Sequence, residues 1–382
     1  MRPKRILVIC PHPEGVAPGQ RLKYEQYFSY FREHGYEVVV SPFMTRPFWN
    51  IVYRDGHLLE KVGWTLWGYL VRVFDLFRLP FYDGVYIFLW VVPFGPPVFE
   101  WAYSLANPNF VYDIDDMVFL KPRSRANAFV SVFKSRSRVT TLMKRARHVI
   151  TCTPVLDEFA RRYNPNTTDI SSTIDTTAYV PAGRYANDGP LTLGWSGSHS
   201  TVKYLGLIKD VLLELNRAAP FKLLVIGGPG FTIEGLDVES IPWSAATEVT
   251  DLRRIDIGLY PLPDEEWVLG KSGLKALQYM ALGIPTVATA VGANFRVIED
   301  GVSGFLVKTE AEWKERLSLL IGDPELRRRV GDEARGRVVR DYSIRSNRDT
   351  YLSVLDTAFG RAAVRPPTDR AASADGLQKL NP

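Results

Sequence analysis

The chain has 382 residues, which is too many for one ordinary core and suits two domains. Hydrophobic residues make up 46% and charged residues 23%, so the composition excludes a largely disordered chain and an integral membrane protein. The net charge is only +5, and the two cysteines, Cys10 and Cys152, are too few for a disulfide framework or a thiolate metal site.

The first half of the chain alternates strands and helices. The apolar run at residues 5–10 is too short for a signal peptide and predicts the first strand. Further strands are predicted at 37–41, 84–91, 110–114 and 148–153, and helices at 24–34, 97–106 and 155–163. This alternation indicates a parallel sheet covered by helices. No run is apolar and long enough for a transmembrane segment, and a cytoplasmic location is expected.

An aromatic stretch inside this half predicts an amphipathic helix. Trp64, Trp67, Leu70, Phe74 and Phe77 recur at three- and four-residue steps. Packing on the first sheet is favoured over a membrane-surface face, because few basic residues lie on the helix.

The second half repeats the strand–helix pattern after a Thr-rich connector at 164–177. Strands are predicted at 191–195, 222–227, 255–260, 285–289 and 304–307, and helices at 201–217, 271–281, 311–321 and 324–341. The fold class is therefore α/β, with two Rossmann-like, doubly wound domains facing across a cleft. The N-terminal domain is expected at 1–185 and the C-terminal domain at 186–361. The helix at 324–341 is expected to pack back on the N-terminal domain, and 362–382 to form a disordered tail.

A basic block follows the strand at 110–114. Residues 117–156 hold nine basic side chains and no acid: Lys121, Arg123, Arg125, Lys134, Arg136, Arg138, Lys144, Arg145 and Arg147. Such a block could attract nucleic acid, an anionic membrane surface or an acidic substrate, and it is equally compatible with a solvated helix face.

A serine-rich loop opens the second domain. Residues 194–201 follow a strand and precede a helix, so backbone N–H groups and hydroxyls should meet at the positive end of the helix dipole. A phosphate group is the ligand that such a loop favours, although Ser198 or Ser200 could instead cap the helix. Gly194, Ser196, Gly197, Ser198 and Thr201 are the predicted donor-side residues.

A second cationic segment lies at 261–285. Lys271, Lys275 and Gln278 follow one another at four- and three-residue steps, which would place them on one helical face against a diphosphate. The Gly-Lys-Ser at 270–272 lacks the earlier glycine of a triphosphate-binding loop, since position 265 is Glu.

The segment 270–285, followed by 291–294, 298–301 and 304–307, resembles the donor-site region of glycosyltransferases of family 4 (group 1), in the GT-B superfamily. Residues 112–116, 174–175, 256–262 and Arg21 agree with this resemblance. It implies a sugar transfer with retention of configuration from a nucleotide-diphosphate sugar, without a metal ion or another cofactor.

The chain departs from the family pattern at two donor positions. Two glutamates of the family are replaced by Gly270 and Gln278, and the resemblance implies that Gln278 binds ribose hydroxyls with its amide. The position that touches the sugar could be served by Asp264, Glu265 or Glu266. The predicted donor site is completed by Ser272 and Gly273.

The N-terminal half should supply the acceptor side. Asp115 and Asp116 match the place where relatives carry residues that face the reacting sugar, and a carboxylate there could take a proton from an acceptor hydroxyl. Alternatively, these acids cap a loop or pair with Lys121 and Arg123. The catalytic prediction is Asp115, Asp116, Lys271 and Lys275, and the acceptor-side prediction is Gly15, Gly19, Arg21 and Asp113.

The expected function is a glycosyltransferase of cell-surface glycan or glycoconjugate synthesis. Its partners would be a nucleotide-sugar donor, a glycan, lipid-linked or small-molecule acceptor and an anionic membrane surface, with no nucleic acid. The missing glutamates leave open a nucleotide-sugar-binding protein without activity, and the fold leaves open a nucleotide-sugar epimerase. The five histidines lack metal-ligand spacing, and no metal site is expected.

Overall fold

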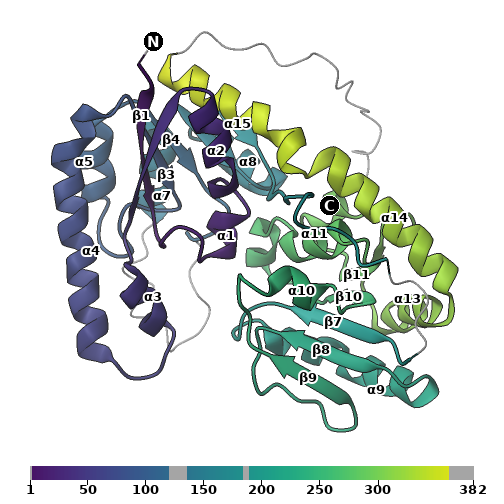
Figure 1. The fold of residues 1–382 in the computed structure, drawn as a ribbon. Coiled ribbons are helices and arrows are strands. Elements are labelled where there is room, and N and C mark those ends of the chain that lie inside the picture. The colour runs from purple at the N-terminus through teal and green to yellow at the C-terminus, as the bar shows by residue number, and fades with distance from the viewer. Residues whose placement is uncertain (1, 120–135, 184–188, 361–382) are drawn as a thin grey trace.

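The computed structural model describes residues 2–119, 136–183 and 189–360. Its strands form two separate six-stranded sheets, and every strand pair within them is parallel. Figure 1 shows the two sheets in two lobes, with the last helices running across both. The prediction of an α/β chain with two doubly wound domains is confirmed.

The N-terminal sheet has the strand order β2-β1-β3-β4-β5-β6. Its strands are β1 Lys4–Cys10, β2 Tyr36–Pro42, β3 Gly84–Phe88, β4 Phe110–Asp113, β5 His148–Thr151 and β6 Thr167–Asp169. Alternate residues of β1 face opposite sides: Leu7 and Ile9 belong to one hydrophobic core, Ile6 and Val8 to the other. The sheet is therefore buried on both faces, which explains its continuous apolar runs.

Helices cover both faces of this sheet. Packed on the Leu7 and Ile9 side are α3 Arg46–Val52, α4 Leu58–Arg78, η2 Leu79–Phe81, α5 Val98–Ala106, α7 Arg136–Arg145 and α8 Pro154–Arg161. The opposite face carries η1 Glu25–Tyr27, α2 Phe28–Glu33 and α15 Ile344–Phe359, and the short helix α1 Pro18–Arg21 precedes them.

The C-terminal sheet has the order β12-β11-β10-β7-β8-β9. Its strands are β7 Thr192–Ser196, β8 Lys222–Ile226, β9 Asp237–Ile241, β10 Ile257–Tyr260, β11 Thr286–Thr289 and β12 Phe305–Val307. Its helices are η4 Val202–Ile208, α9 Lys209–Ala218, α10 Glu248–Leu252, η5 Glu266–Gly270, α11 Leu274–Ala281, α12 Asn294–Val297, α13 Glu310–Gly322 and α14 Pro324–Asp341.

The chain returns to the N-terminal domain through α15, and not through the helix at 324–341 as predicted. Helix α14 packs against α11 and α13 of the C-terminal domain. Helix α15 buries Tyr351, Leu352 and Leu355 among residues of β1 and α2. Two hydrogen bonds between Ile174 and the residues that flank Ser343 hold the crossing point. The prediction was wrong because it missed α15.

Other short elements also differ from the sequence prediction. The connector at 164–177 contains β6, which pairs with β5, and the predicted helix 201–217 is a 3-10 turn, η4, followed by α9. The predicted helix 24–34 is likewise divided into η1 and α2. The boundary near residue 185 and the tail at 362–382 lie outside the described residues. No helix in the described part of the chain has the length and apolar character needed to span a bilayer.

Candidate functional site

A cavity of about 250 Å³ lies between the two domains, at the carboxyl edges of their sheets. Open parallel sheets bind ligands at this edge. The N-terminal domain contributes Gly19, Asp115, Asp116 and Ser172, and the C-terminal domain contributes Ser198, Thr201, Tyr260, Leu262, Trp267, Lys271, Ser272, Gly273, Leu274 and Lys275. Acidic groups thus line one wall of the cavity and basic groups the other.

The two lysines reach the cavity from different elements. Lys275 lies in the first turn of α11, whereas Lys271 precedes that helix in the loop after η5. The prediction that both share one helical face with Gln278 was wrong, because α11 begins at Leu274. The loop nevertheless brings both side chains to the same cavity.

Their electrostatic surroundings are opposite. Burial alone would lower the pKa of Lys271, but its ion pair with Asp116 outweighs burial and raises that pKa. Burial lowers the pKa of Lys275 to about 7, and repulsion from Lys271 adds to the effect. The ammonium of Lys275 lies over the rings of Trp195 and Tyr260, at 4.5 and 5.6 Å, and pairs with no acid among the described residues. The side chain of Lys275 therefore has no acidic partner in the described part of the chain.

The backbone at Gly197 makes room for this lysine. A Cβ atom at position 197 would lie 2.6 Å from the Lys275 Nζ and 2.3 Å from the Trp195 ring. Both distances are shorter than any van der Waals contact. Gly197 does not line the cavity itself, but its missing side chain holds the lysine pocket open.

Two carboxylates form the opposite wall. Asp115 and Asp116 follow β4, and Asp116 is the partner of Lys271. Burial raises the pKa of Asp115 to about 7, although the nearby Lys23 ammonium acts in the opposite direction. A Cβ atom at Gly19 would lie 2.9 Å from the Asp115 Oδ2, so this carboxylate lies directly against the backbone of α1. Asp115 can therefore accept a proton near neutral pH.

Asp113, a predicted acceptor-side residue, is buried and does not line the cavity. Its carboxylate is fully buried, lies 3.0 Å from the Lys23 Nζ and accepts a hydrogen bond from Tyr86. Burial alone would lower the pKa of Lys23, but Asp113 reverses this and raises it. The pair anchors the first loop to β4, and it leaves Asp113 no access to a ligand.

The serine-rich loop offers hydroxyls, whereas its amides are largely used within the protein. The amide of Ser196 donates to the Tyr279 hydroxyl (2.7 Å), and that of Gly197 to the carbonyl of Ile226 (2.9 Å). The amides of Ser198 and Thr201 bond each other's oxygen atoms. The predicted row of unpaired N–H groups is therefore wrong at these four positions. The hydroxyls of Ser198 and Thr201 line the cavity.

Several predicted donor residues lie outside the cavity. Gly194 is inside β7, where a Cβ would overlap Ile255, and Gly270 packs against Met117 of the other domain. Gln278 is buried, and its amide donates to the Tyr179 hydroxyl (3.0 Å). Asp264 and Glu266 are exposed, and Glu265 accepts a hydrogen bond from Trp267. Tertiary contacts thus hold Gly270 and Gln278, the two positions at which the family carries glutamates.

Two further predicted acceptor-side residues lie outside the cavity. Gly15 donates its amide to the Glu25 carboxylate (2.9 Å) outside the cavity. Arg21 crosses to the C-terminal domain, where it pairs with the buried Glu248 and stacks on Trp243. Glu248 also accepts a hydrogen bond from Tyr179. Arg21 therefore ties the domains together and does not face the cavity.

Sequence reasoning missed several lining residues. Tyr260 is the last residue of β10 and Leu262 lies just after it, so their place at the carboxyl end of a strand could have identified them. Ser172 follows the unpredicted strand β6, and its hydroxyl lies 2.7 Å from that of Ser272. Trp267 lies in η5 beside Lys271, with its ring 5.6 Å from the ammonium.

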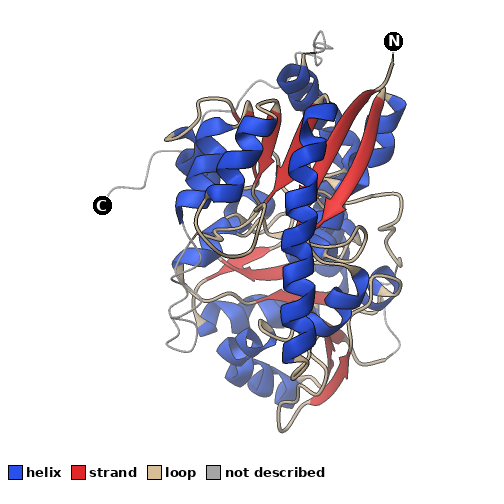
Figure 2. Ribbon diagram, turned by 90° about the vertical axis from the view of Figure 1, so that its left-hand side faces the viewer, coloured by secondary structure: helices blue, strands red, loops and turns tan. Residues whose placement is uncertain are grey.

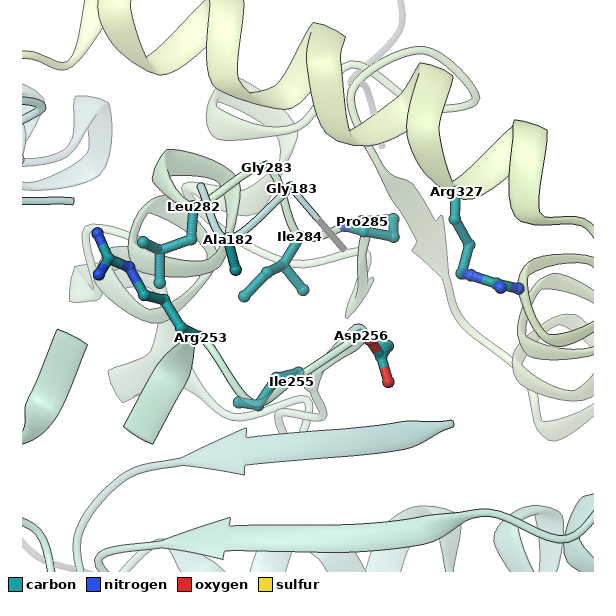
Figure 3. A pocket seen from close by; sticks show the side chains of 10 residues that line it. All are labelled: Ala182, Gly183, Arg253, Ile255, Asp256, Leu282, Gly283, Ile284, Pro285 and Arg327. Carbon is teal, nitrogen blue, oxygen red and sulfur yellow. The ribbon is translucent and has the colours of Figure 1, made fainter. Parts of the chain in front are cut away.

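A second cavity lies at the opposite edge of the C-terminal sheet. Figure 3 shows Asp256 and Pro285 at its wall, just before β10 and β11, with Arg327 nearby. Its volume is about 20 Å³, which is room for one water molecule. It is too small for a nucleotide or a sugar. Among the described residues, no three His, Cys, Asp or Glu side chains gather as metal ligands would.

Comparison with known proteins finds a family match within the C-terminal domain. Residues 190–323 match the family model described as glycosyl transferases group 1. D-inositol 3-phosphate glycosyltransferase of Stackebrandtia nassauensis is 26% identical over 227 residues, which cover 50% of this chain and 49% of that protein. The chain spans about half the length of the curated relatives it matches, or less.

Solved structures share the whole fold. Sucrose-phosphate synthase from Thermosynechococcus elongatus aligns with a TM-score of 0.69 and 17% identity, over 93% of this chain and 99% of that one. Anabaena Alr3699/HepE in complex with UDP and glucose aligns with a TM-score of 0.62 and 14% identity, over 93% and 100%. The chain therefore has the GT-B fold.

Proposed function

We propose that the chain transfers a sugar from a nucleotide-diphosphate sugar to an acceptor hydroxyl, because residues 190–323 match the family model of glycosyl transferases group 1. The observation that carries this proposal is the cavity between the domains. It sets the ammoniums of Lys271 and Lys275 opposite the carboxylates of Asp115 and Asp116. A diphosphate leaving group needs cations, and an acceptor hydroxyl needs a group that takes its proton.

The C-terminal wall would hold the donor diphosphate. Lys275 is the better anchor, because it has no acidic partner among the described residues and an anion would restore its charge. Lys271 would exchange its bond to Asp116 for one to the diphosphate, or would share both. The hydroxyls of Ser198 and Thr201 can donate to phosphate oxygens beside them. The Anabaena structure holds UDP and glucose, which supports a nucleotide-sugar donor for this chain.

The N-terminal wall would act on the acceptor. The bond between the anomeric carbon and the diphosphate oxygen breaks, and both electrons leave with the diphosphate, where the lysines stabilise the new charge. The acceptor oxygen bonds to the anomeric carbon and releases its proton. Asp115 is the proposed proton acceptor, because burial raises its pKa to about 7 and so makes it a stronger base than an exposed carboxylate.

The finer assignments also belong to this proposal. Resemblance to family 4 suggests that configuration is retained, without a metal ion or another cofactor, and that the product belongs to a cell-surface glycan or glycoconjugate. A cytoplasmic enzyme at the inner face of a membrane would fit such an acceptor. The alternative is a binding protein without turnover, which the displaced family glutamate positions at Gly270 and Gln278 favour.

A donor screen tests the proposal directly. Purified protein is heated with each of a panel of nucleotide sugars, and a ligand at 100 times its Kd should add about 2.7 kcal/mol to the stability of the folded state. The stabilising donor is then incubated with acceptor mixtures, and release of the nucleoside diphosphate is measured. Stabilisation with release no faster than hydrolysis would favour the binding protein. Absence of stabilisation by every donor would refute the proposal.

Lys275→Ala should reduce the stabilisation, because it removes a cation that has no acidic partner among the described residues. Lys314→Ala is the matched control, since Lys314 is an exposed lysine of the same domain, paired with Glu214 outside the cavity. Equal loss in both variants would show that general charge, and not the cavity, holds the donor.

A further inference from the structure

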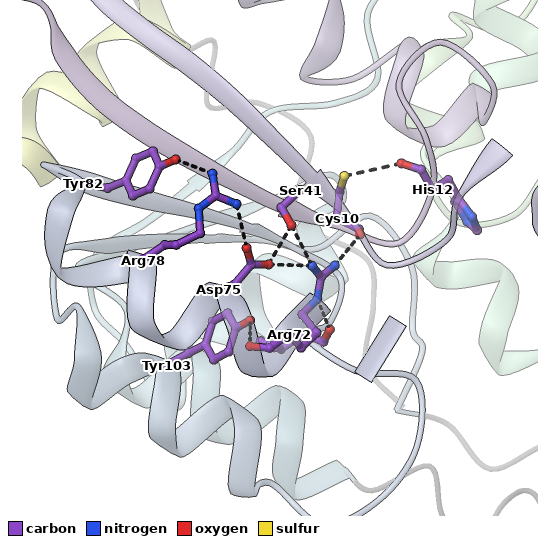
Figure 4. A network of polar contacts seen from close by, with 9 residues as sticks. Cys10, His12, Ser41, Arg72, Asp75, Arg78, Tyr82 and Tyr103 are labelled. Atoms are coloured by element: carbon purple, nitrogen blue, oxygen red, sulfur yellow. Dashed lines mark hydrogen bonds and ion pairs between the residues drawn. The ribbon is translucent and has the colours of Figure 1, made fainter. Parts of the chain in front are cut away.

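Helix α4 presents its polar side to the protein. Arg72 and Asp75 are fully buried beneath it, 3.0 Å apart. Figure 4 shows the network around them, in which Arg72 donates to the carbonyls of Cys10 and Val91, and Ser41 donates to Asp75. Polar contacts therefore attach the middle of α4 to the sheet.

The apolar side of the same helix faces outward. Leu70 is 61% exposed, Phe74 62% and Phe77 72%. The full stripe follows helical spacing through Leu58, Leu59, Val62, Leu66, Trp67, Leu70, Val73, Phe74 and Phe77. Figure 2 looks onto this helix, which runs down the front of the molecule with no other element over it. The sequence prediction that the aromatic stripe packs on the sheet is wrong for these residues.

This orientation is the reverse of that in a helix on the surface of a water-soluble domain. There the apolar stripe faces the core and charged residues face water. At 1.5 Å per residue, the 21 residues of α4 make an apolar stripe roughly 30 Å long. A contiguous exposed patch of this kind marks a binding surface.

Neighbouring elements extend the surface. Helix α5 packs beside α4 and exposes Val98, Trp101 and Leu105, and η2 exposes Phe81. We call this set of outward side chains of α4, η2 and α5 the apolar face.

A basic edge borders the apolar face. Helix α7 packs on the far side of α5 in the same helical layer, and Lys144, Arg145 and the following Arg147 are exposed there. These three residues have no acidic partner among the described residues. Arg138, by contrast, is buried against Glu100, and Lys121, Arg123, Arg125 and Lys134 lie outside the described residues.

We propose that the apolar face docks on an anionic lipid bilayer, with the basic edge on the lipid headgroups. The pattern of apolar and basic side chains favours a bilayer. The interior of a bilayer with acidic lipids is apolar, like the apolar face, and its negative surface would attract the basic edge. Trp67 and Trp101 supply the amphipathic rings that favour the boundary between lipid and water. A second copy of the chain would instead bring two basic edges near each other.

Docking would place the start of α4, at the carboxyl edge of the N-terminal sheet, on the lipid surface. Helix α3 follows the carboxyl end of β2 and leads into α4, so α4 begins at the edge of the sheet that carries Asp115. Figure 1 shows α3 and the start of α4 at this end of the N-terminal domain. That the acceptor comes from the membrane rests on the glycosyl transfer proposed above, whereas the docking itself does not.

Vesicle co-sedimentation tests the docking without donor or acceptor. The full chain is mixed with phosphatidylcholine vesicles that contain or lack about one third phosphatidylglycerol by lipid, at low and high salt. We expect binding to the acidic vesicles that weakens with salt. Leu70→Glu with Phe74→Glu should reduce it at least tenfold, because two charges would enter the apolar layer. A triple variant should bind the acidic vesicles more weakly, by about fivefold for each cation removed. It carries Lys144→Ala, Arg145→Ala and Arg147→Ala.

Matched variants in the C-terminal domain serve as controls. Leu319→Glu with Val339→Glu places the same charges on exposed apolar positions, and Lys209→Ala, Arg217→Ala and Arg329→Ala remove the same number of cations. Both should bind vesicles as the wild type does. Equal losses in these controls, or no binding by the wild type, would overturn the proposal. So would a dimer in analytical ultracentrifugation that Leu70→Glu with Phe74→Glu dissociates, because a second copy would then cover the face.

Retention of donor binding in the α4 variants would show that docking can fail while the cavity remains intact. Heat protection by the donor supplies this second measurement, which is independent of lipid.

Discussion

The number of protons taken up on donor binding can be predicted from Lys275, because the protonation of this side chain should change when the diphosphate binds. Burial lowers the pKa of its ammonium to about 7, so about half of the free protein carries the proton at pH 7 and about one tenth at pH 8. A diphosphate placed beside it would raise the pKa toward the ordinary value of a lysine. Donor binding at pH 8 should therefore take up about 0.9 proton.

The same linkage fixes how affinity changes with pH. The bound-state pKa is the higher one, so the contribution of this lysine is complete below pH 7 and is lost as the pH rises toward the bound value. If the diphosphate fully restores the lysine, the Kd should rise about 50-fold between pH 7 and pH 9, which is about 2.3 kcal/mol. Ionisation of Asp115 in the same range would add repulsion, so Asp115→Asn is the background in which Lys275 is measured.

Isothermal titration calorimetry in buffers of different ionisation enthalpy measures the proton uptake. A nucleotide sugar is the suitable ligand, because neither of its phosphates is a monoester that titrates near pH 7. Uptake near 0.9 proton at pH 8 in Asp115→Asn, and none when Lys275→Ala is added, is the expected result. A Kd that stays constant from pH 7 to pH 9 with the lysine present would refute the reasoning.

Three other substitutions test the remaining parts of the structure. Asp115→Asn should lower kcat about 10²–10⁴-fold while donor binding persists, and unchanged kcat would remove Asp115 from the mechanism. Gly19→Ala should displace the Asp115 carboxylate and lower kcat about tenfold or more, as misplacement of a catalytic group does, whereas Gly336→Ala, in α14 with nothing within 4 Å of its Cβ, should leave that carboxylate in place. Arg72→Met should destabilise the protein by about 3–5 kcal/mol in urea unfolding, because it removes the buried partner of Asp75 and leaves that buried carboxylate only the partly exposed Arg78 as a cation; a change below 1 kcal/mol would contradict the burial of this pair.

Sequence periodicity predicted the larger elements well. Runs such as Ile6 to Ile9 and Leu223 to Ile226 are apolar at every position, as strands buried on both faces must be. Strand β6 was not predicted, because Thr167 to Asp169 is polar and lies at the edge of the sheet. Only its pairing with β5 identifies it as a strand. Short edge strands depend on a neighbour more than on composition.

The candidate site was predictable only in part. The positions after strands led to Asp115, Lys271 and Lys275, because parallel sheets gather such loops at one edge. The hydrogen-bond partners of the Ser196 and Gly197 amides could not be predicted from the sequence, because Tyr279 and Ile226 are distant along the chain. Likewise, periodicity revealed the stripe of α4 but not its direction, which the buried partners of Arg72 decide.

Asp115 and Lys275 titrate in the same range but are needed in opposite forms. The free protein is competent when Asp115 is ionised and Lys275 is protonated, and burial brings the pKa of each to about 7. A plot of kcat/KM against pH should therefore be bell-shaped with its maximum near pH 7 and fall about tenfold per pH unit on either side. With saturating donor, Lys275 stays protonated, so kcat should keep only the rise through the titration of Asp115. A kcat profile that still falls above pH 7 would mean that the diphosphate does not reach Lys275.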